Sequence, residues 1–251
     1  MSFTDILDPD AIDRAAPLPL YHQLREALLE PLQNGQWQEG DPIPTEREIC
    51  QTYDVSRITV RRAIDELVRE GYLVTRQGKG TFVAKPKIQR HLSQLKSFSE
   101  EMAEEGHRAG SRLLSLRHEQ AVGDVAAALG VENGTWIWIV ERLRLADDEP
   151  MGISRAHLRL PPGVYLTPDE LREKTSLWGI LREKGIQFAS SEVTIQAVAA
   201  TEQEAKLLDV EPGAPLLLVE GVVYSTDGSP IEYHKMVNRG DRYKYNVRTP
   251  R

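Results

Sequence analysis

Two capped helical segments separated by a short break, and followed by a glycine-rich hairpin, constrain the fold of this chain most. Thr45 precedes the segment EREICQTY, and Glu48 lies three residues later, which is the pattern of a helix capping box. Ser56 then caps a second helical segment that ends near Gly71. Two helices joined by about three residues form a helix-turn-helix, which presents its second helix outward.

We expect this second helix to bury one side and to carry basic residues in its first two turns. The β-prone runs 72–75 and 81–84 flank the loop Arg76-Gln-Gly-Lys-Gly80 and predict a hairpin, whose glycines permit positive φ angles at the tip. A hairpin in this place is a wing. An earlier helix is predicted over 19–33 from its leucines at every fourth position. The expected apolar side of the second helix consists of Ile58, Val60, Ala63, Ile64, Leu67 and Val68.

Charge distribution favours a nucleic-acid partner for this region. The whole chain of 251 residues has a net charge of −7, but residues 55–90 hold nine Lys and Arg against three Asp and Glu. A local basic surface is what phosphate neutralisation requires. The acidic N-terminus and the lack of a long apolar run predict no signal peptide and no membrane span. The single cysteine, Cys50, is expected in the core, and these features together predict a cytoplasmic protein.

The remaining pattern predicts an α+β fold in which a winged helix-turn-helix is followed by an antiparallel sheet domain with helices. Beyond residue 95, helical and strand-like segments alternate, and hairpin turns occur near 147–150 and 226–230. The expected organisation is a flexible arm over 1–16, a winged helix-turn-helix over 17–85, a linker over 86–94 and a second domain over 95–248.

Several basic side chains are placed to contact DNA. Arginine can bond guanine O6 and N7 together, and other arginines can clamp phosphates. Glycines at the wing tip allow close approach to the minor groove. The alternative is a set of surface arginines in i,i+4 ion pairs, such as Arg61 with Asp65 or Arg62 with Glu66. The candidate DNA-binding residues are Arg47, Arg57, Thr59, Arg61, Gly78, Lys79 and Gly80.

Residues 19–83, which include the motifs PTEREIC and SRITVRRAIDEL, resemble the winged-helix domain of the GntR family. The resemblance implies that Arg47, Arg57, Arg61 and Gly78 contact operator DNA, with Thr59, Lys79 and Thr81 as weaker candidates.

The second domain shows the pattern of an anion-binding pocket. Arg142 and Arg144 alternate along one predicted strand and therefore face the same side, where two guanidiniums suit a phosphate or carboxylate. Ser97 and Ser176 each open a predicted helix and can join such a site. Glu232 alternates with His234 on the last hairpin and can hold hydroxyl or amine groups. The alternative for the arginine pair is a solvent-facing strand with cross-strand salt bridges.

Residues 88–248 resemble the UTRA effector domain of the HutC-type branch of that family, which has a chorismate-lyase-like fold. The segments SFSEEMAEEGHRAGSRLLSL, ERLRLADDEPMGISRAHL and SPIEYHKMVNRGDRYKY carry the resemblance. It implies that Ser97, Arg142, Arg144, Ser176 and Glu232 contact an effector. Three positions depart from relatives that sense amino-sugar phosphates, because the chain has Ser154, Trp178 and Asn238 where those relatives have an acid and two tyrosines.

The function expected from these features is a homodimeric repressor that binds double-stranded operator DNA and responds to a small anionic metabolite. A sugar phosphate is the leading effector and urocanate the next. The alternative is a chorismate-lyase-like enzyme fused to a winged helix. The sequence has no Ser-His-Asp constellation and no metal-spaced His/Cys cluster, so neither a catalytic site nor a metal or other cofactor is expected.

Overall fold

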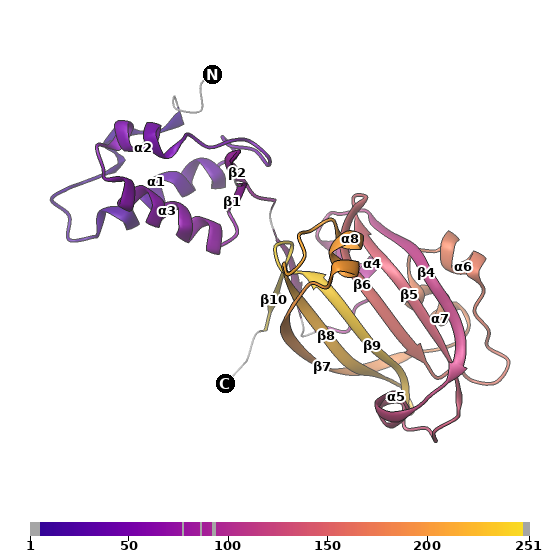
Figure 1. The fold of residues 1–251 in the computed structure, drawn as a ribbon. Helices are drawn as coiled ribbons and strands as arrows, with labels where there is room; N and C mark the ends of the chain where they lie inside the picture. Colours follow the sequence, from indigo (N-terminus) through magenta and orange to yellow (C-terminus); the bar gives the residue numbers. More distant parts are fainter. Residues whose placement is uncertain (1–5, 77, 86, 92–93, 248–251) are drawn as a thin grey trace. The chain divides into compact units, whose positions relative to one another are not determined.

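The structure is a computed structural model that describes residues 6–76, 78–85, 87–91 and 94–247, and it divides into two compact units (Figure 1). The division in the sequence falls between Lys87 and Ile88. The first five residues of the expected arm, parts of the expected linker and residue 248 lie outside the described residues.

The N-terminal unit is the expected winged helix-turn-helix. The Thr45 hydroxyl accepts a hydrogen bond from the Glu48 N–H at 3.3 Å, and the Glu48 carboxylate accepts one from the Thr45 N–H at 2.7 Å, which completes the capping box. Ser56 accepts from the Thr59 N–H at 3.2 Å and so begins the next helix. The elements are α1 (Leu20–Gln33), α2 (Glu46–Tyr53), α3 (Arg57–Arg69), β1 (Leu73–Arg76) and β2 (Gly80–Val83).

One residue of α3 lies opposite to its expected position. Ile58 is 81% exposed, whereas Val60 and Ala63 are fully buried. At 100° per residue, Ile58 lies about 200° from Val60, so the two side chains point to nearly opposite sides of α3, and only the side of Val60 faces the core. The assignment of Ile58 to the apolar side was therefore wrong.

The described part of the expected arm packs on the winged unit. Leu7 is buried in its core with Ile12 beside it, and Asp8 caps a short 3-10 helix, η2 (Pro9–Ala11). Arg14 forms an ion pair with Asp54 at 2.8 Å. Residues 6–16 thus differ from the expected flexible arm because three apolar side chains, Ile6, Leu7 and Ile12, anchor this polar segment on the core.

The C-terminal unit is built on one six-stranded antiparallel sheet, as expected. Its strand order is β4-β5-β6-β9-β8-β7, so two hairpins adjoin where β6 pairs with β9. The strands are β4 (Ala109–Gln120), β5 (Trp136–Ala146), β6 (Glu149–Leu158), β7 (Phe188–Ala199), β8 (Pro215–Ser225) and β9 (Pro230–Arg239).

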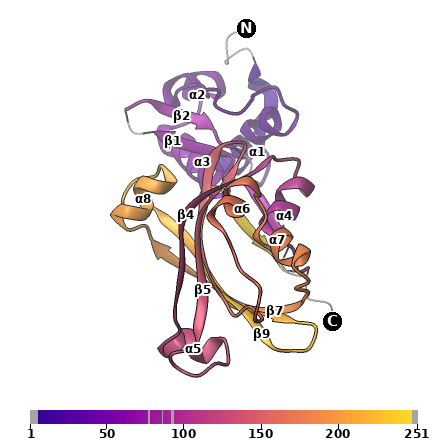
Figure 2. The same cartoon turned by 90° about the vertical axis from the view of Figure 1, so that its right-hand side faces the viewer.

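Helices cover both faces of this sheet. Leu177 and Leu181 of α7 pack with Val140 and Leu158 on one face, while Leu208 of α8 packs with Leu143 on the other. Figure 2 shows α8 on one side of the sheet and α4, α6 and α7 on the other. The helices are α4 (Phe98–Glu104), α5 (Gly123–Ala128), α6 (Pro168–Glu173), α7 (Leu177–Glu183) and α8 (Glu202–Leu208).

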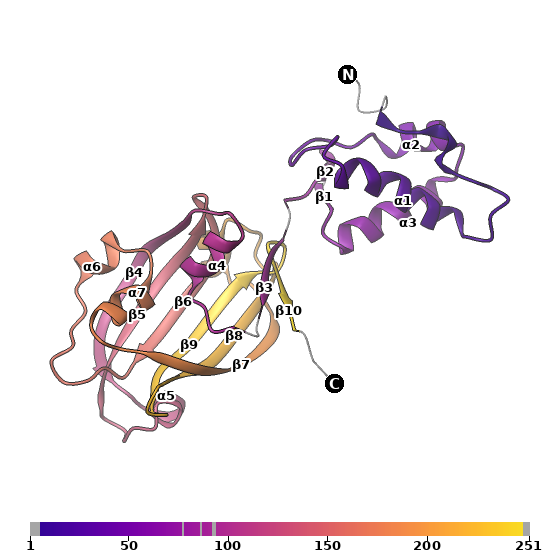
Figure 3. The same cartoon turned by 180° about the vertical axis from the view of Figure 1, so that it is seen from behind.

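Most of the expected linker that the structure describes is a strand. β3 (Ile88–His91) pairs in parallel with the last strand, β10 (Tyr243–Asn246), and Figure 3 shows the two side by side. Ile88 and Tyr243 are both buried in one apolar cluster. The linker assignment of 86–94 was wrong for this part, because a short strand paired with a distant partner leaves no periodic pattern of its own.

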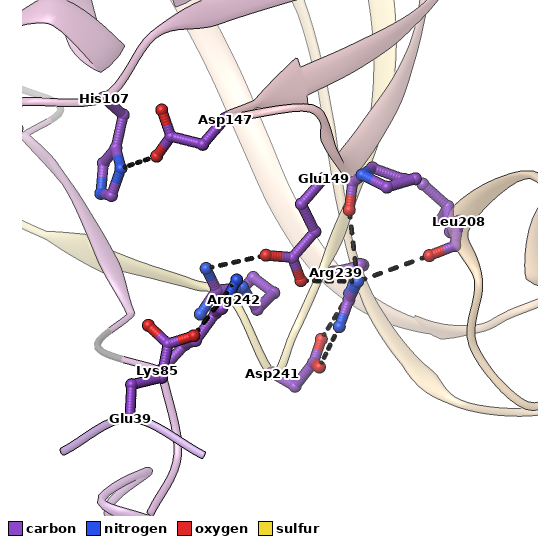
Figure 4. Close-up of polar contacts among 10 residues, drawn as sticks. Glu39, Lys85, His107, Asp147, Glu149, Leu208, Arg239, Asp241 and Arg242 are labelled. Carbon is purple, nitrogen blue, oxygen red and sulfur yellow. Dashed lines mark hydrogen bonds and ion pairs between the residues drawn. The ribbon is translucent and has the colours of Figure 1, made fainter.

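A partly buried ionic network fixes the turn that leads into β10 (Figure 4). Arg239 forms ion pairs with Glu149 at 3.1 Å and Asp241 at 2.7 Å, and it donates to the Pro150 carbonyl at 3.3 Å. Arg242 contacts the second Glu149 oxygen at 3.2 Å. The start of β6 therefore positions β10, and β10 in turn positions β3.

Replacing Leu28 by alanine should destabilise the winged unit by about 2–5 kcal/mol, because the side chain is fully buried and a cavity would remain. Urea unfolding followed by circular dichroism measures the change. Leu18→Ala is the matched control, since Leu18 is 48% exposed and its loss should cost far less. Equal effects of the two substitutions would contradict this core.

Candidate functional site

A basic surface lies on the exposed side of α3 and at the start of α2. Arg57 and Arg61 share one partner, Glu46, with Nε to carboxylate distances of 3.5 and 3.0 Å. Both guanidinium side chains remain about 70% exposed. Glu46 therefore holds the two arginines side by side while leaving them accessible to an anion.

Other polar side chains of α3 differ in how many contacts they make within the winged unit. Arg62 lies 3.6 Å from the Tyr21 ring centroid and 3.9 Å from Glu66, so its i,i+4 pair is formed. Arg61 pairs with Glu46 and not with Asp65. The Thr59 hydroxyl lies 2.9 Å from the Ser56 hydroxyl. Of the three, Arg61 is the one left most accessible.

The remaining candidate DNA contacts are exposed. Arg47, in the first turn of α2, makes no ion pair within 4 Å in the described part of the chain. At the wing, Gly78 and Gly80 have φ angles of +72° and +116°, which favour glycine, and a Cβ on Gly78 would meet nothing within 4 Å. Lys79 lies exposed between them. The wing tip can therefore approach another surface closely.

A cavity lies in the C-terminal unit between one face of the sheet, the segment that leads into α4 and the start of α7. Cationic, carboxylate, hydroxyl and apolar side chains line it together. They include Arg90, Lys96, Ser97, Glu101, Arg144, Ser154, Ser176, Trp178, Ser191, Glu232, His234 and Met236.

Two buried guanidiniums on β5, of which only that of Arg144 lines the cavity, have incomplete hydrogen bonding. Arg142 and Arg144 each donate to the carbonyl oxygen of Thr175, at 3.0 and 3.1 Å. Arg142 is 1% exposed and Arg144 is 9% exposed, so the solvent-facing alternative does not apply. Nε and one terminal nitrogen of Arg142, and Nε of Arg144, have no partner among the described residues. Unpaired buried donors carry a free-energy cost that an anion would relieve.

Burial also changes the acid–base properties of the pair. Loss of hydration, together with repulsion from Arg144, lowers the pKa of Arg142, and burial lowers the pKa of Arg144 to about 10. Arg144 therefore remains cationic at neutral pH. The charge of Glu232, which also lines the cavity, opposes this shift for both arginines.

Trp178 and Glu232 form a second polar wall. The indole Nε1 of Trp178 donates to Glu232 Oε2 at 2.7 Å, and the ring stacks on Phe188 with centroids 4.5 Å apart. One carboxylate oxygen of Glu232 is thereby occupied by the protein itself.

The structure brings together six of the eight expected effector residues. Ser97, Arg144, Ser154, Ser176, Trp178 and Glu232 line the cavity. Arg142 lies behind them and does not line it. Asn238 does not line it either, because its amide donates to the Tyr245 hydroxyl at 2.9 Å beneath β10.

Three charged lining residues, Arg90, Lys96 and Glu101, were missed by the sequence reasoning. Arg90 of β3 forms an ion pair with Glu101 of α4 at 2.5 Å, and the guanidinium lies 5.7 Å from the Tyr245 ring centroid. Arg90 belongs to the segment 86–94, for which the sequence predicts a linker. Glu101 follows Ser97 by four residues on the same helical face, a spacing that could have identified it.

The two serines at helix starts differ in what they can offer a ligand. Ser97 is in a capping box, so its N–H donates to Glu100 at 2.7 Å and its hydroxyl accepts from the Glu100 N–H at 3.3 Å. Ser176 accepts from the Gly179 N–H at 3.0 Å, and its hydroxyl proton remains available for donation.

Within the described ranges, no group of three or more His, Cys, Asp or Glu side chains could hold a metal ion. None of the helices described is long and apolar enough to cross a membrane.

A winged helix combined with a cavity-bearing antiparallel sheet domain is the build of a two-domain transcriptional regulator. Residues 20–83 match the model of bacterial regulatory proteins of the gntR family, and residues 104–244 match the UTRA domain. The chain belongs to the GntR family and carries a UTRA domain.

Its relatives are named as transcriptional repressors rather than as enzymes. The HTH-type transcriptional repressor NagR of Bacillus subtilis is 37% identical over 93% of this chain and 96% of its own length. PhnF of Mycolicibacterium smegmatis is 34% identical over 93% of this chain and 94% of its own length. The crystal structure of PhnF from Mycobacterium smegmatis superimposes with a TM-score of 0.62 and covers 90% of this chain and 99% of that one, at 32% identity.

His234 should titrate below pH 6.5, because burial disfavours its imidazolium form and lowers its pKa despite the opposing effect of Glu232. As pH falls, His234 is therefore protonated at a higher pH in the unfolded chain than in the folded chain. The stability from neutral His234 is therefore present above about pH 6.5 and is lost as pH falls toward the folded-state pKa. NMR titration of the imidazole signals measures the pKa, and urea unfolding between pH 7 and 5 measures the stability. His234→Gln should lose less stability over this range than the native chain, and a His234 midpoint at or above 6.5 would contradict the assignment.

Proposed function

We propose that this chain is a homodimeric repressor that binds operator DNA through α3 and the wing, and that a small anionic metabolite in the UTRA cavity controls this binding. The observation that carries the effector class is the buried Arg144 guanidinium, which lines the cavity with an unpartnered Nε. Family membership supports the DNA-binding half.

The basic surface of α3 supports operator recognition. Arg57 and Arg61 are held in adjacent positions by Glu46, and a DNA phosphate or base edge can replace that carboxylate. Arg47 is placed to contact the flanking backbone, and Gly78, Lys79 and Gly80 to approach the minor groove. Two copies related by a two-fold axis would contact two half-sites of a palindrome about one helical turn apart.

The cavity supports an effector with an anionic group at one end and hydroxyl groups at the other. Arg144 and the Ser176 hydroxyl can donate to the anion, and Ser97 and Ser154 lie in the same lining. Arg142 acts from behind by holding Thr175, the residue that precedes Ser176. The free oxygen of Glu232 can accept from a ligand hydroxyl.

A sugar phosphate fits this arrangement best, because a phosphate suits a guanidinium fork and the sugar supplies the hydroxyls. Urocanate is the second candidate, since its carboxylate suits Arg144 as well. The name of one relative supports this second candidate. It is the histidine utilization repressor of Pseudomonas putida, which is 27% identical over 92% of this chain and 92% of its own length.

Replacing Arg57 or Arg61 by alanine should weaken operator binding by about 1–3 kcal/mol each if the side chain contacts a base. A mobility shift on a duplex from the promoter of the adjacent operon measures the affinity at low salt. Arg112→Ala is the matched control, because Arg112 is exposed on β4 of the other unit and should leave the affinity unchanged. Failure of the native chain to bind any palindrome there would refute the repressor.

The effector is tested by thermal unfolding with inorganic phosphate, glucosamine 6-phosphate and urocanate as probes. A ligand at about 100 times its Kd should stabilise the native chain by roughly 2.7 kcal/mol. Arg144→Gln should lose this stabilisation relative to its own ligand-free midpoint, whereas Arg112→Gln should keep it. Equal stabilisation of both variants would place the anion elsewhere.

A further inference from the structure

The outward face of α3 holds one apolar side chain among charged ones. Five of its six exposed residues are charged, and the sixth, Ile58, is 81% exposed, the highest value among the large apolar residues described. Residues 61, 62 and 65 lie on the same side of the helix as Ile58, at spacings of three, four and seven. The exposed residues of this face are Arg57, Ile58, Arg61, Arg62, Asp65 and Arg69.

Nothing in the fold of the winged unit requires an isoleucine here. The buried residues of α3 are Val60, Ala63, Ile64 and Leu67, and Ile58 belongs to none of the apolar clusters of the structure. Its exposure leaves apolar surface in water that a polar residue would avoid. A role outside the fold is therefore the simpler explanation.

The side chain is also presented in a fixed way. Ser56 caps the first turn through the Thr59 N–H at 3.2 Å, so the backbone on both sides of Ile58 is held. A β-branched side chain in a helix has one strongly preferred χ1 rotamer. The methyl groups of Ile58 therefore project from the helix with little freedom to lose on binding.

The neighbours of Ile58 restrict what it can contact. Arg57 and Arg61 lie on the same exposed surface, and Arg62 adds a third cation. An apolar protein surface or a lipid interior would have to bury these charges as well, at a large free-energy cost. The major groove of DNA instead offers phosphate and base acceptors for the arginines and one apolar group, the C5 methyl of thymine.

We propose that Ile58 is a specificity-determining residue that packs against the C5 methyl of a thymine in each operator half-site. This inference rests on the proposed function, in which α3 enters the major groove. Arg57 and Arg61 then supply charge and hydrogen bonds, and Ile58 selects thymine at one position by apolar contact.

The expected effect follows from the burial of a single methyl group. Loss of one buried methyl weakens binding about fourfold, and loss at both half-sites of a dimer about fifteenfold. Deoxyuridine differs from thymidine only by this methyl, so it removes the contact without changing the hydrogen-bonding pattern of the base pair.

The test uses the full chain and a duplex selected by repeated binding and amplification from a random-sequence pool. Each thymine of the selected duplex is replaced in turn by deoxyuridine, and the Kd is measured for each duplex. At one thymine position in each half-site, the native chain should bind the deoxyuridine duplex about fourfold more weakly.

Variants of Ile58 separate this contact from any effect of the substitution on DNA shape. Ile58→Ala should weaken binding to the thymine duplex and bring the thymine-to-deoxyuridine ratio at that position close to one. Ile58→Val, which keeps both Cγ carbons and loses only the Cδ carbon, should retain most of the ratio. Val122→Ala, at a residue 65% exposed in the other unit, is the control and should leave every ratio unchanged. The thermal midpoint of Ile58→Ala should equal that of the native chain.

The outcomes distinguish this inference from the function on which it rests. If no duplex is enriched, operator binding and the thymine contact are both overturned. If the native chain binds a selected duplex but no thymine position is sensitive, only the role of Ile58 is overturned. The same holds if Ile58→Ala keeps the native ratio at the sensitive position.

Discussion

Burial of two arginines beneath one face of the sheet is the constraint around which the C-terminal unit is arranged. Arg142 and Arg144 donate to the same carbonyl oxygen, that of Thr175, and so tie the start of α7 to β5. Two like charges held out of water cost free energy, because these hydrogen bonds use only part of their donors. The position of α7 also places Ser176 and Trp178 at the cavity. Three guanidinium nitrogens of the arginine pair thus remain without a hydrogen-bond acceptor among the described residues.

In the winged unit, contacts within the unit itself hold the side chains of the basic surface in place. Thr45 and Ser56 define where α2 and α3 begin, and this places Glu46 within reach of both Arg57 and Arg61. The Glu46 carboxylate holds the two arginines beside each other, and a phosphate of the same charge could take its place. Ile58 stands on the same surface without a partner in the apolar core. The first turns of α3 therefore expose two charged side chains, Arg57 and Arg61, and one apolar side chain, Ile58, on the same surface.

The sequence predicted the parts of the site that depend on local periodicity. Alternation along β5 placed Arg142 and Arg144 on one face, and cap residues placed Ser97 and Ser176 at helix starts. The sequence did not predict that Arg142 lies behind the cavity lining. Alternation along a strand indicates which face of the sheet a side chain is on, but not whether that side chain reaches the cavity. Asn238 was misplaced for a similar reason, because Tyr245 covers it from a strand outside the sheet. The helical pattern likewise misassigned Ile58, because an apolar residue is not by itself evidence of burial.

Local sequence alone determined the helix-turn-helix, the wing and the hairpins of the sheet domain, because caps, turns and apolar periods act between residues a few positions apart. Tertiary structure decided which polar groups meet. Arg90 and Glu101 line the cavity because β3 pairs with β10, and that pairing depends on the Glu149, Arg239 and Arg242 network. Contacts between segments so far apart in the chain leave no local pattern, since each depends on how the whole unit packs. The capped helices and the wing can therefore be predicted from local sequence patterns, whereas the full set of residues around the cavity is determined only by the tertiary structure.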